Sequence, residues 1–117
     1  MAERFNIEID QGTTFELGAQ FFDSNEVARD LTGFIVRMQV RPLPDSPNTL
    51  DELSTTNGRI VLTAPNEMKL LWTAEQTARL PAGNHAYDIE LVTTDETPER
   101  VERLFEGDVV VKQEVTR

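Results

Sequence analysis

The stretch DLTGFIVRMQVR, residues 30–41, combines a turn signal with a strand that has two different faces. The apolar face carries Phe34, Val36, Met38 and Val40, and the other face carries Arg37, Gln39 and Arg41 with one apolar residue, Ile35. Alternation with a period of two marks a strand with one face in a core and one in water. Several further segments repeat this pattern, so the sequence predicts a small β domain.

Turn signals divide the rest of the chain into short segments of the same kind. We expect strands at residues 4–9, 13–22, 49–54, 59–63, 68–72, 85–92, 101–105 and 109–112, with a shorter segment at 27–31. No stretch is long enough for the crossover helices of a parallel sheet. Eight or nine short strands predict an all-β, mostly antiparallel sandwich or small barrel.

Three local signals refine this expectation. Asn57-Gly58 predicts a tight turn, because Gly accepts a positive φ. One short helical turn is expected near residues 74–80, where Thr73 precedes Gln76 by the three residues of a capping box. Gly107, inside the last strand region, suggests a bulge or bend.

Length and composition limit the classes of protein to consider. The 117 residues predict one domain over residues 1–112 and a tail at 113–117. The absence of cysteine excludes disulfides, zinc–thiolate sites and cysteine nucleophiles. No apolar run reaches the length of a membrane span, and charges interrupt the first ten residues where a signal peptide would be apolar, so we expect no export signal.

The net charge of −10, from 21 acidic and 11 basic residues, is large for this length. It argues against binding to nucleic acid or to an anionic membrane, because both need clustered Lys and Arg. Two interpretations stay open. The charge keeps copies soluble until a specific interface forms, or it matches a basic partner surface.

Residues that could carry chemistry are few. His85 is the single histidine, and its neighbours on the same strand face are apolar, which favours a structural role. Trp72 closes a strand just before the helix cap and is expected to fill the core instead of stacking on a sugar. The carboxylates fall mostly on outward strand positions and turns. We therefore expect no enzyme, no catalytic residue, no cofactor and no metal.

One weak calcium-loop pattern is present. Asp23, Asn25 and Asp30 have part of the required spacing. However, Ala28 stands where such a loop needs Gly, and Phe34 stands where it needs a bidentate Glu. A plain β-turn is the favoured interpretation.

Contact with another protein is the remaining use for the surface. Phe22 and Ile35 fall on the wetter faces of their strands and could form a docking patch with Leu43. Two exposed segments could also make contacts. They are the proline-rich loop at residues 42–48, with Pro44 and Asp45, and the charged turn at residues 93–99, with Asp95 and Glu96. Either segment could equally be a solvated loop without a partner.

Five segments, taken together and in order, resemble a recurrent kind of small bacteriophage structural protein. They are QGTTFELGAQFFDSN (11–25), DLTGFIVRMQVR (30–41), NGRIVL (57–62), TAEQTARLPAGNHAYDIEL (73–91) and RLFEGDVVVKQEVTR (103–117). The chain is similar to N-terminal domains of phage baseplate and tail-fibre proteins and to stand-alone neck, tail or head-decoration proteins. The resemblance implies an immunoglobulin-like or related β-sandwich without catalytic residues.

The resemblance also implies a function. The chain would be a virion structural protein, made in the bacterial host cytoplasm, that docks on the particle through contacts with capsid, neck, tail or baseplate proteins. It would act there in several symmetric copies, as a tail, neck or baseplate adaptor or as a capsid decoration (cement) protein. The alternative is a receptor- or carbohydrate-binding module of a tail fibre. That function needs a concave aromatic face, for which Trp72 and Tyr87 are available besides Phe.

Overall fold

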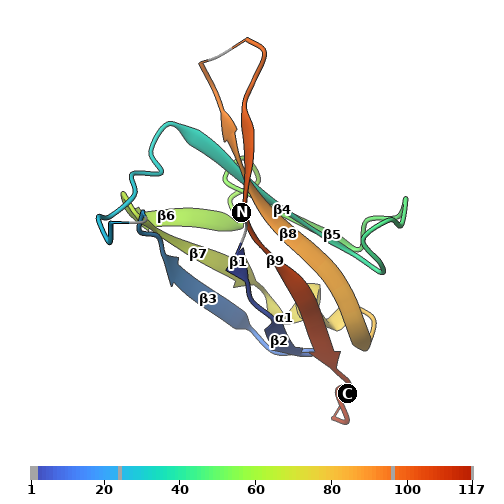
Figure 1. Cartoon of the computed structure of the whole chain (residues 1–117). Coiled ribbons are helices and arrows are strands. Elements are labelled where there is room, and N and C mark those ends of the chain that lie inside the picture. The colour runs from blue at the N-terminus through green and yellow to red at the C-terminus, as the bar shows by residue number, and fades with distance from the viewer. Residues whose placement is uncertain (1–2, 24, 96, 117) are drawn as a thin grey trace.

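The computed structural model describes residues 3–23, 25–95 and 97–116, and two β-sheets packed face to face make up most of it (Figure 1). One sheet contains β1 (Glu3–Arg4), β2 (Ile7–Asp10), β4 (Phe34–Arg41), β5 (Asp51–Ser54), β8 (Gly83–Thr93) and β9 (Val101–Lys112). The other contains β3 (Phe15–Gln20), β6 (Ile60–Ala64) and β7 (Glu67–Trp72). A short helix, α1 (Ala74–Ala78), connects β7 to β8.

The strand order identifies the type of sandwich. In the six-stranded sheet, β9, β8, β4 and β5 are neighbours in that order, and β1 and β2 both pair with β9. In the three-stranded sheet the order is β3, β7, β6. These orders match the G-F-C-C′ and B-E-D sheets of immunoglobulin domains. The predicted all-β, immunoglobulin-like sandwich with one short helix is confirmed, and among the described strands no pairing joins the two sheets into a barrel.

Pairing is antiparallel except at the N-terminal strands. β1 and β2 run parallel to β9, with Ile7 opposite Val109 and Ile9 opposite Val111. The other named strand pairs are antiparallel. β1 and β2 therefore extend the larger sheet, and neither of them pairs with β3.

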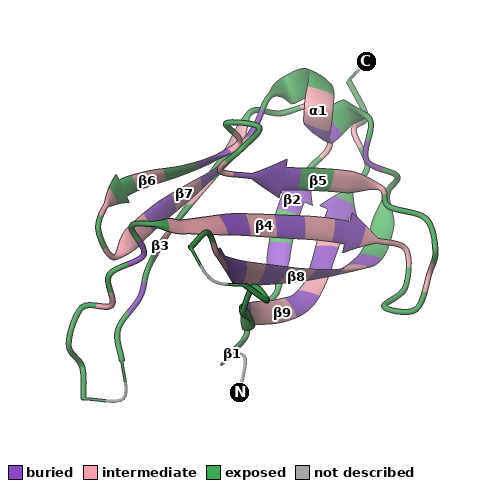
Figure 2. Cartoon of the chain, turned by 90° about the horizontal axis from the view of Figure 1, so that it is seen from above, coloured by how far each residue is buried: buried purple, intermediate pink, exposed green. Residues whose placement is uncertain are grey.

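The core lies between the sheets and follows the alternation seen in the sequence. Val36, Met38 and Val40 of β4 are fully buried, and Figure 2 shows buried residues recurring along β4 and β8. The opposite sheet contributes alternate residues of β7, of which Trp72 is 1% exposed. Trp72 fills the core as predicted, because its ring packs between the sheets where water is excluded.

The first predicted strand, residues 4–9, is interrupted. β1 and β2 are separated at Phe5 and Asn6, and the Phe5 side chain is 50% exposed, although alternation placed it with the core residues. The Phe5 carbonyl oxygen lies so close to Gly107 that a Cβ there would be 2.3 Å away. Close backbone approach therefore explains why residue 107 is glycine.

The bulge predicted at Gly107 lies elsewhere. The register of β8 against β9 shifts between Ile89 and Glu90, whose partners are Phe105 and Arg103. The extra residue on β9 is therefore Leu104, three positions before Gly107. Glycine is required at position 107 because the backbone of the N-terminal segment approaches closely there, and not because of the bulge.

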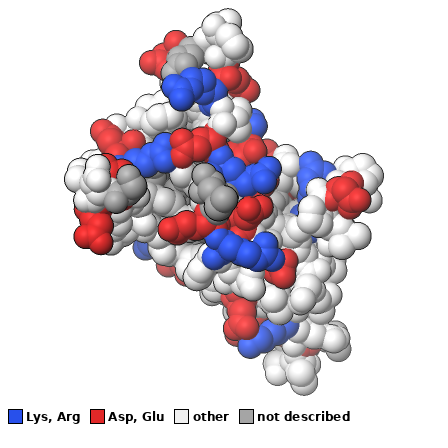
Figure 3. Space-filling model, viewed as in Figure 1, with Lys and Arg blue, Asp and Glu red and all other residues white. Residues whose placement is uncertain are grey.

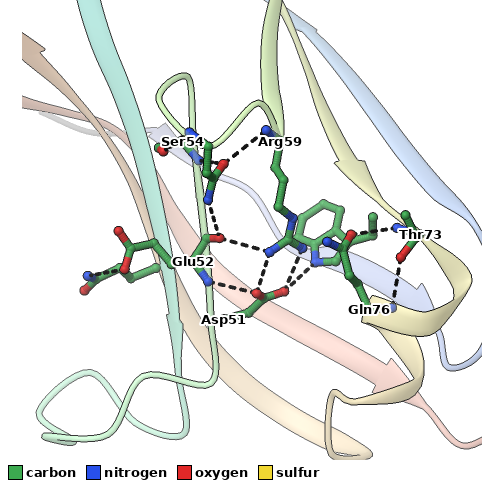
Figure 4. Close-up of polar contacts among 9 residues, drawn as sticks. Asp51, Glu52, Ser54, Arg59, Thr73 and Gln76 are labelled. Carbon is green, nitrogen blue, oxygen red and sulfur yellow. Dashed lines mark hydrogen bonds and ion pairs between the residues drawn. The ribbon is translucent and has the colours of Figure 1, made fainter.

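A polar cluster joins the two sheets (Figure 4). The Asp51 carboxylate on β5 accepts two hydrogen bonds from the Arg59 guanidinium, at 2.6 and 2.9 Å, and one from Trp72 Nε1, at 3.0 Å. Arg59 precedes β6, and Trp72 ends β7, so the cluster ties the edge of the larger sheet to the smaller one. The turn at Asn57-Gly58 is the connection between these sheets, and Gly58 has φ of 79°.

The predicted capping box is also present. The Thr73 hydroxyl accepts from the Gln76 backbone N–H at 3.1 Å, and the Gln76 side chain accepts from the Thr73 N–H at 2.8 Å (Figure 4). These two bonds satisfy donors that a helix start leaves free. They explain why five residues hold a helical conformation between two strands.

Candidate interaction surface

The apolar residues predicted to form one patch are not brought together. Phe22 is 55% exposed and Leu43 is 63% exposed, but Ile35 is partly buried. Ile35 lies near the start of β4 and Leu43 beyond its end, so the strand between them is about 20 Å long. The structure therefore does not gather the three residues in one compact patch, and a contact role for each of them stays a prediction.

The proline-rich loop at residues 42–48 folds against the larger sheet. The Arg41 guanidinium donates to the Ser46 carbonyl oxygen at 2.9 Å, and Pro44 lines a hollow of about 310 Å³ on the outer face of the sheet. Gln39, Asp88 and Arg103 line the same hollow, while Asp45 is exposed at the loop tip. The loop is thus available for contact, with a polar face beside it.

The charged turn at residues 93–99 belongs to the projecting hairpin of β8 and β9 (Figure 1). Asp95 is exposed, and Glu96 lies outside the described residues. The base of the hairpin is held by the Thr93 N–H, which donates to the Arg100 carbonyl at 3.0 Å. Asp95 is consequently carried away from the sandwich body.

The outer face of the larger sheet carries interspersed charges. Arg37 pairs with Glu90 at 3.0 Å, and Arg103 lies 3.4 Å from Asp88. Partial burial, followed by the negative charge of Glu90, raises the pKa of the Asp88 carboxyl. Figure 3 shows acidic and basic side chains mixed over the face it presents. The ion pairs on the outer face of the larger sheet therefore make it a network of compensated charges and not one acidic patch.

His85 and Tyr87, which were considered as candidates for chemistry, each contact a backbone carbonyl oxygen. His85 is 9% exposed, and its Nε2 lies 2.6 Å from the Pro81 carbonyl oxygen, which can only accept, so this nitrogen carries the hydrogen. Tyr87 is buried and donates to the Phe5 carbonyl, and burial raises its pKa to about 12. In the described part of the chain, no three His, Asp or Glu side chains gather as metal ligands.

The calcium-loop pattern is a turn. Asp23 accepts hydrogen bonds from the Asn25 N–H at 2.8 Å and the Val27 N–H at 3.0 Å. Asp30 accepts from the Thr32 N–H and hydroxyl, and the hydroxyl bond is the main cause of a lowered pKa at Asp30. The two carboxylates stabilise separate local turns, which agrees with the favoured interpretation.

The sequence did not point to the open side of the sandwich, between β3 and the N-terminal strands. A mainly apolar hollow of about 250 Å³ opens there toward the core. Leu17 and Ala19 of β3 and Phe5 of the N-terminal segment border it, and a second hollow continues it along Phe5, Phe15 and Leu17. Alternation along β3 was evident in the sequence, but whether any strand covers its outer edge depends on the tertiary pairing of the N-terminal segment.

Comparisons with known proteins add little to this geometry. No protein-family model matches the chain, and no curated protein matches it. The chain is similar to a solved structure titled "Tim-1", with 13% sequence identity and a TM-score of 0.44, over all of this chain and 99% of that one. In the described residues, no helix is both long and apolar enough to cross a membrane.

Proposed function

We propose that this chain is a bacteriophage virion structural protein that docks on the particle through protein–protein contacts. It acts as a tail, neck or baseplate adaptor or as a capsid decoration protein. The part of the proposal that concerns phage rests on the order of turn and strand motifs in the sequence. The part that concerns protein contacts rests on the surface of the sandwich.

The observation that carries the contact role is the open side between β3 and the N-terminal strands. It combines a mainly apolar hollow, a half-exposed Phe5 and an unpaired strand edge in the described part of the chain. Exposed apolar surface of this kind, rimmed by polar residues, is typical of protein interaction sites. The projecting hairpin of β8 and β9 and the loop at residues 42–48 supply further contact tips.

Catalysis has no comparable support. His85 is held by a backbone carbonyl, and the carboxylates on the outer face of the larger sheet lie beside guanidinium groups. The carbohydrate-binding alternative needs aromatic faces open to solvent. Trp72 and Tyr87 are 1% and 5% exposed, so neither ring offers one. We therefore propose a non-enzymatic structural role and keep the receptor-binding role second.

Mass spectrometry of purified phage particles tests the proposal. Particles from the strain that carries the gene should contain the chain in a constant ratio to the major capsid protein, through successive density gradients. Phage made without the gene should stop at one step of particle assembly, and supplying the parent chain should restore that step. If the chain stays in the soluble lysate and is absent from purified particles, the proposed function is wrong.

A further inference from the structure

The outer edge of β3 presents free backbone groups. The Phe21 N–H donates to the Asn66 carbonyl oxygen, and the Leu71 N–H donates to the Arg59 carbonyl oxygen. These two bonds show which residues of β7 bond to β3 and which bond to β6. Leu17 and Ala19 therefore bond to β7, since hydrogen-bonded residues alternate along an antiparallel strand. Glu16, Gly18 and Gln20 direct their N–H and C=O groups outward, where no strand of the described residues pairs with them.

This edge lacks most of the features that normally block edge-to-edge pairing, and Glu16 is its one charged residue. β3 pairs with β7 over six residues without irregularity and contains no proline and no lysine. By contrast, the register of β6 shifts between Leu62 and Ala64, and β5 has four residues. Bulges and short edge strands protect sheet edges, and β3 has neither.

Gly18, at the middle of the edge, has no role within the chain that requires glycine. It is the glycine whose φ is not positive, and a Cβ there would come no closer than 4.0 Å to another group, the Met68 carbonyl oxygen. Glycine inside a strand costs stability, and it often marks a place where another backbone approaches closely.

The sequence of β3 is complementary to itself in one antiparallel register. With a two-fold axis at Gly18, each Gly18 faces the partner's Gly18, and each Glu16 faces the partner's Gln20. No two like charges are directly opposed, and an amide can donate to a carboxylate. The three facing pairs in this register can exchange about six backbone hydrogen bonds.

We propose that the β3 edge joins the β3 edge of a second copy of this chain, giving a two-fold dimer with a continuous six-stranded sheet. Leu17 and Ala19 of each copy then approach their counterparts, and the apolar hollow beside Phe5 is covered. This inference deepens the proposed many-copy structural role, but purified chain is enough to test it. The net charge of −10 opposes association, so added salt strengthens the dimer.

Cysteine cross-linking tests the register, because the chain has no cysteine of its own. Facing Cα atoms of a hydrogen-bonded pair lie about 5.5 Å apart, which a disulfide can span. G18C chains should therefore form covalent dimers under mild oxidation. Q20C is the matched control, because the two copies of residue 20 would be about 13 Å apart along the strands and should not link. A mixture of E16C and Q20C chains should link to each other.

Sedimentation velocity over about 10 µM to 1 mM chain, a range suited to small interfaces, tests the uncrosslinked protein. Q20E opposes two carboxylates on each side of the axis and should raise the dimer dissociation constant about five- to tenfold. The double variant E16Q/Q20E restores a carboxylate facing an amide and should restore the dimer. Q113E, in the exposed segment after β9, matches the added charge and should have no such effect.

The double variant also separates the interface from folding. Gln20 donates to Glu67 within one chain at 3.0 Å, and both Gln20 variants lose that bond equally. Recovery of the dimer in E16Q/Q20E alone therefore reports the contact between copies. A chain that is monomeric throughout, equal cross-linking of G18C and Q20C, or no recovery in the double variant would each overturn the inference. A dimer whose chain is missing from phage particles would overturn only the proposed function.

Discussion

Asp51→Ala is the substitution that most directly tests how the two sheets are joined. The Asp51 carboxylate binds the Arg59 guanidinium through two hydrogen bonds and accepts a third from Trp72. The side chains of Arg59 and Asp51 are 16% and 17% exposed, so water can replace little of what is lost. Arg59 Nε is buried and has no hydrogen-bond partner in the described structure. The guanidinium therefore depends on Asp51 and on the Glu52 carbonyl, to which Nη1 donates at 2.9 Å.

The expected cost follows from this geometry. Removing one partner of a buried ion pair costs about 3–5 kcal/mol, because the other charge stays buried without compensation. Residual exposure of the pair lowers that value, so we expect a loss of about 3 kcal/mol in the free energy of unfolding. With a urea m-value of about 1.5 kcal/mol/M for a domain of this size, the unfolding midpoint should fall by about 2 M.

Urea unfolding followed by fluorescence is the assay, since Trp72 is the single tryptophan and is buried. Circular dichroism on the same samples checks that the signal reports unfolding and not only the loss of a polar neighbour. Asp108→Ala is the control: its pair with Arg4 is 3.7 Å long with side chains 41% and 66% exposed, so a change below about 0.5 kcal/mol is expected.

A second variant sharpens the interpretation. Combining Asp51→Ala with Arg59→Met removes both charges and should recover at least about 1 kcal/mol relative to Asp51→Ala alone. A midpoint shift below about 0.5 M for Asp51→Ala, or a further loss in the double variant, would refute the view that this pair joins the sheets.

Three further predictions concern the backbone, the helix and the outer sheet face. Gly107→Ala should cost about 2 kcal/mol by urea unfolding, because its Cβ would lie 2.3 Å from the Phe5 carbonyl oxygen. Gly18→Ala, where a Cβ would come no closer than 4.0 Å to the Met68 carbonyl oxygen, should instead stabilise the fold by about 0.5–1 kcal/mol, and an equal loss at both positions would contradict the close approach at Gly107. Thr73→Ala removes the capping hydroxyl and should lower the free energy of unfolding by about 1 kcal/mol, measured as a lower Tm. Thr73→Ser keeps a hydroxyl at this position and should keep most of the stability. Asp88→Asn should stabilise the fold slightly at pH 7. The pKa of Asp88 is higher in the folded than in the unfolded chain, so ionised Asp88 destabilises the folded state at a pH above the folded-state pKa. This penalty disappears below the unfolded value of 3.8, where Asp88 is protonated in both states. A variant that is less stable than the parent at pH 7 but not at pH 3 would show that the Arg103 pair dominates instead.

Local sequence rules predicted much of the architecture. The expected strand at residues 34–41 is β4 without a change of bounds; of its inward residues Val36, Met38 and Val40 are fully buried, while Phe34 at the start of the strand is partly buried. The capping box at Thr73 and the turn at Gly58 also formed as expected. Each of these features depends on neighbours within a few residues, either through strand alternation or through hydrogen bonds that a short segment makes with itself.

The failures involve groups that are far apart in the chain. Phe5 fits the core pattern but is half exposed, because the N-terminal segment bends where its carbonyl meets Gly107. Ile35 and Leu43 fit a common patch but lie at opposite ends of β4. The interaction surface was therefore only partly predictable: the exposed loops were found, while the open side beside β3 was not.

The sequence by itself determined which residues turn inward, because alternation along each strand and the turn residues between strands are local properties of the chain. Only the tertiary structure decided which strand edges were covered. β1 and β2 pair with β9, so that no strand among the described residues pairs with the outer edge of β3, and Asp51 meets Arg59 and Trp72 across two sheets. The physical reason is that strand pairing and sheet packing join residues distant in sequence, and the choice among partners depends on the free energy of the whole sandwich.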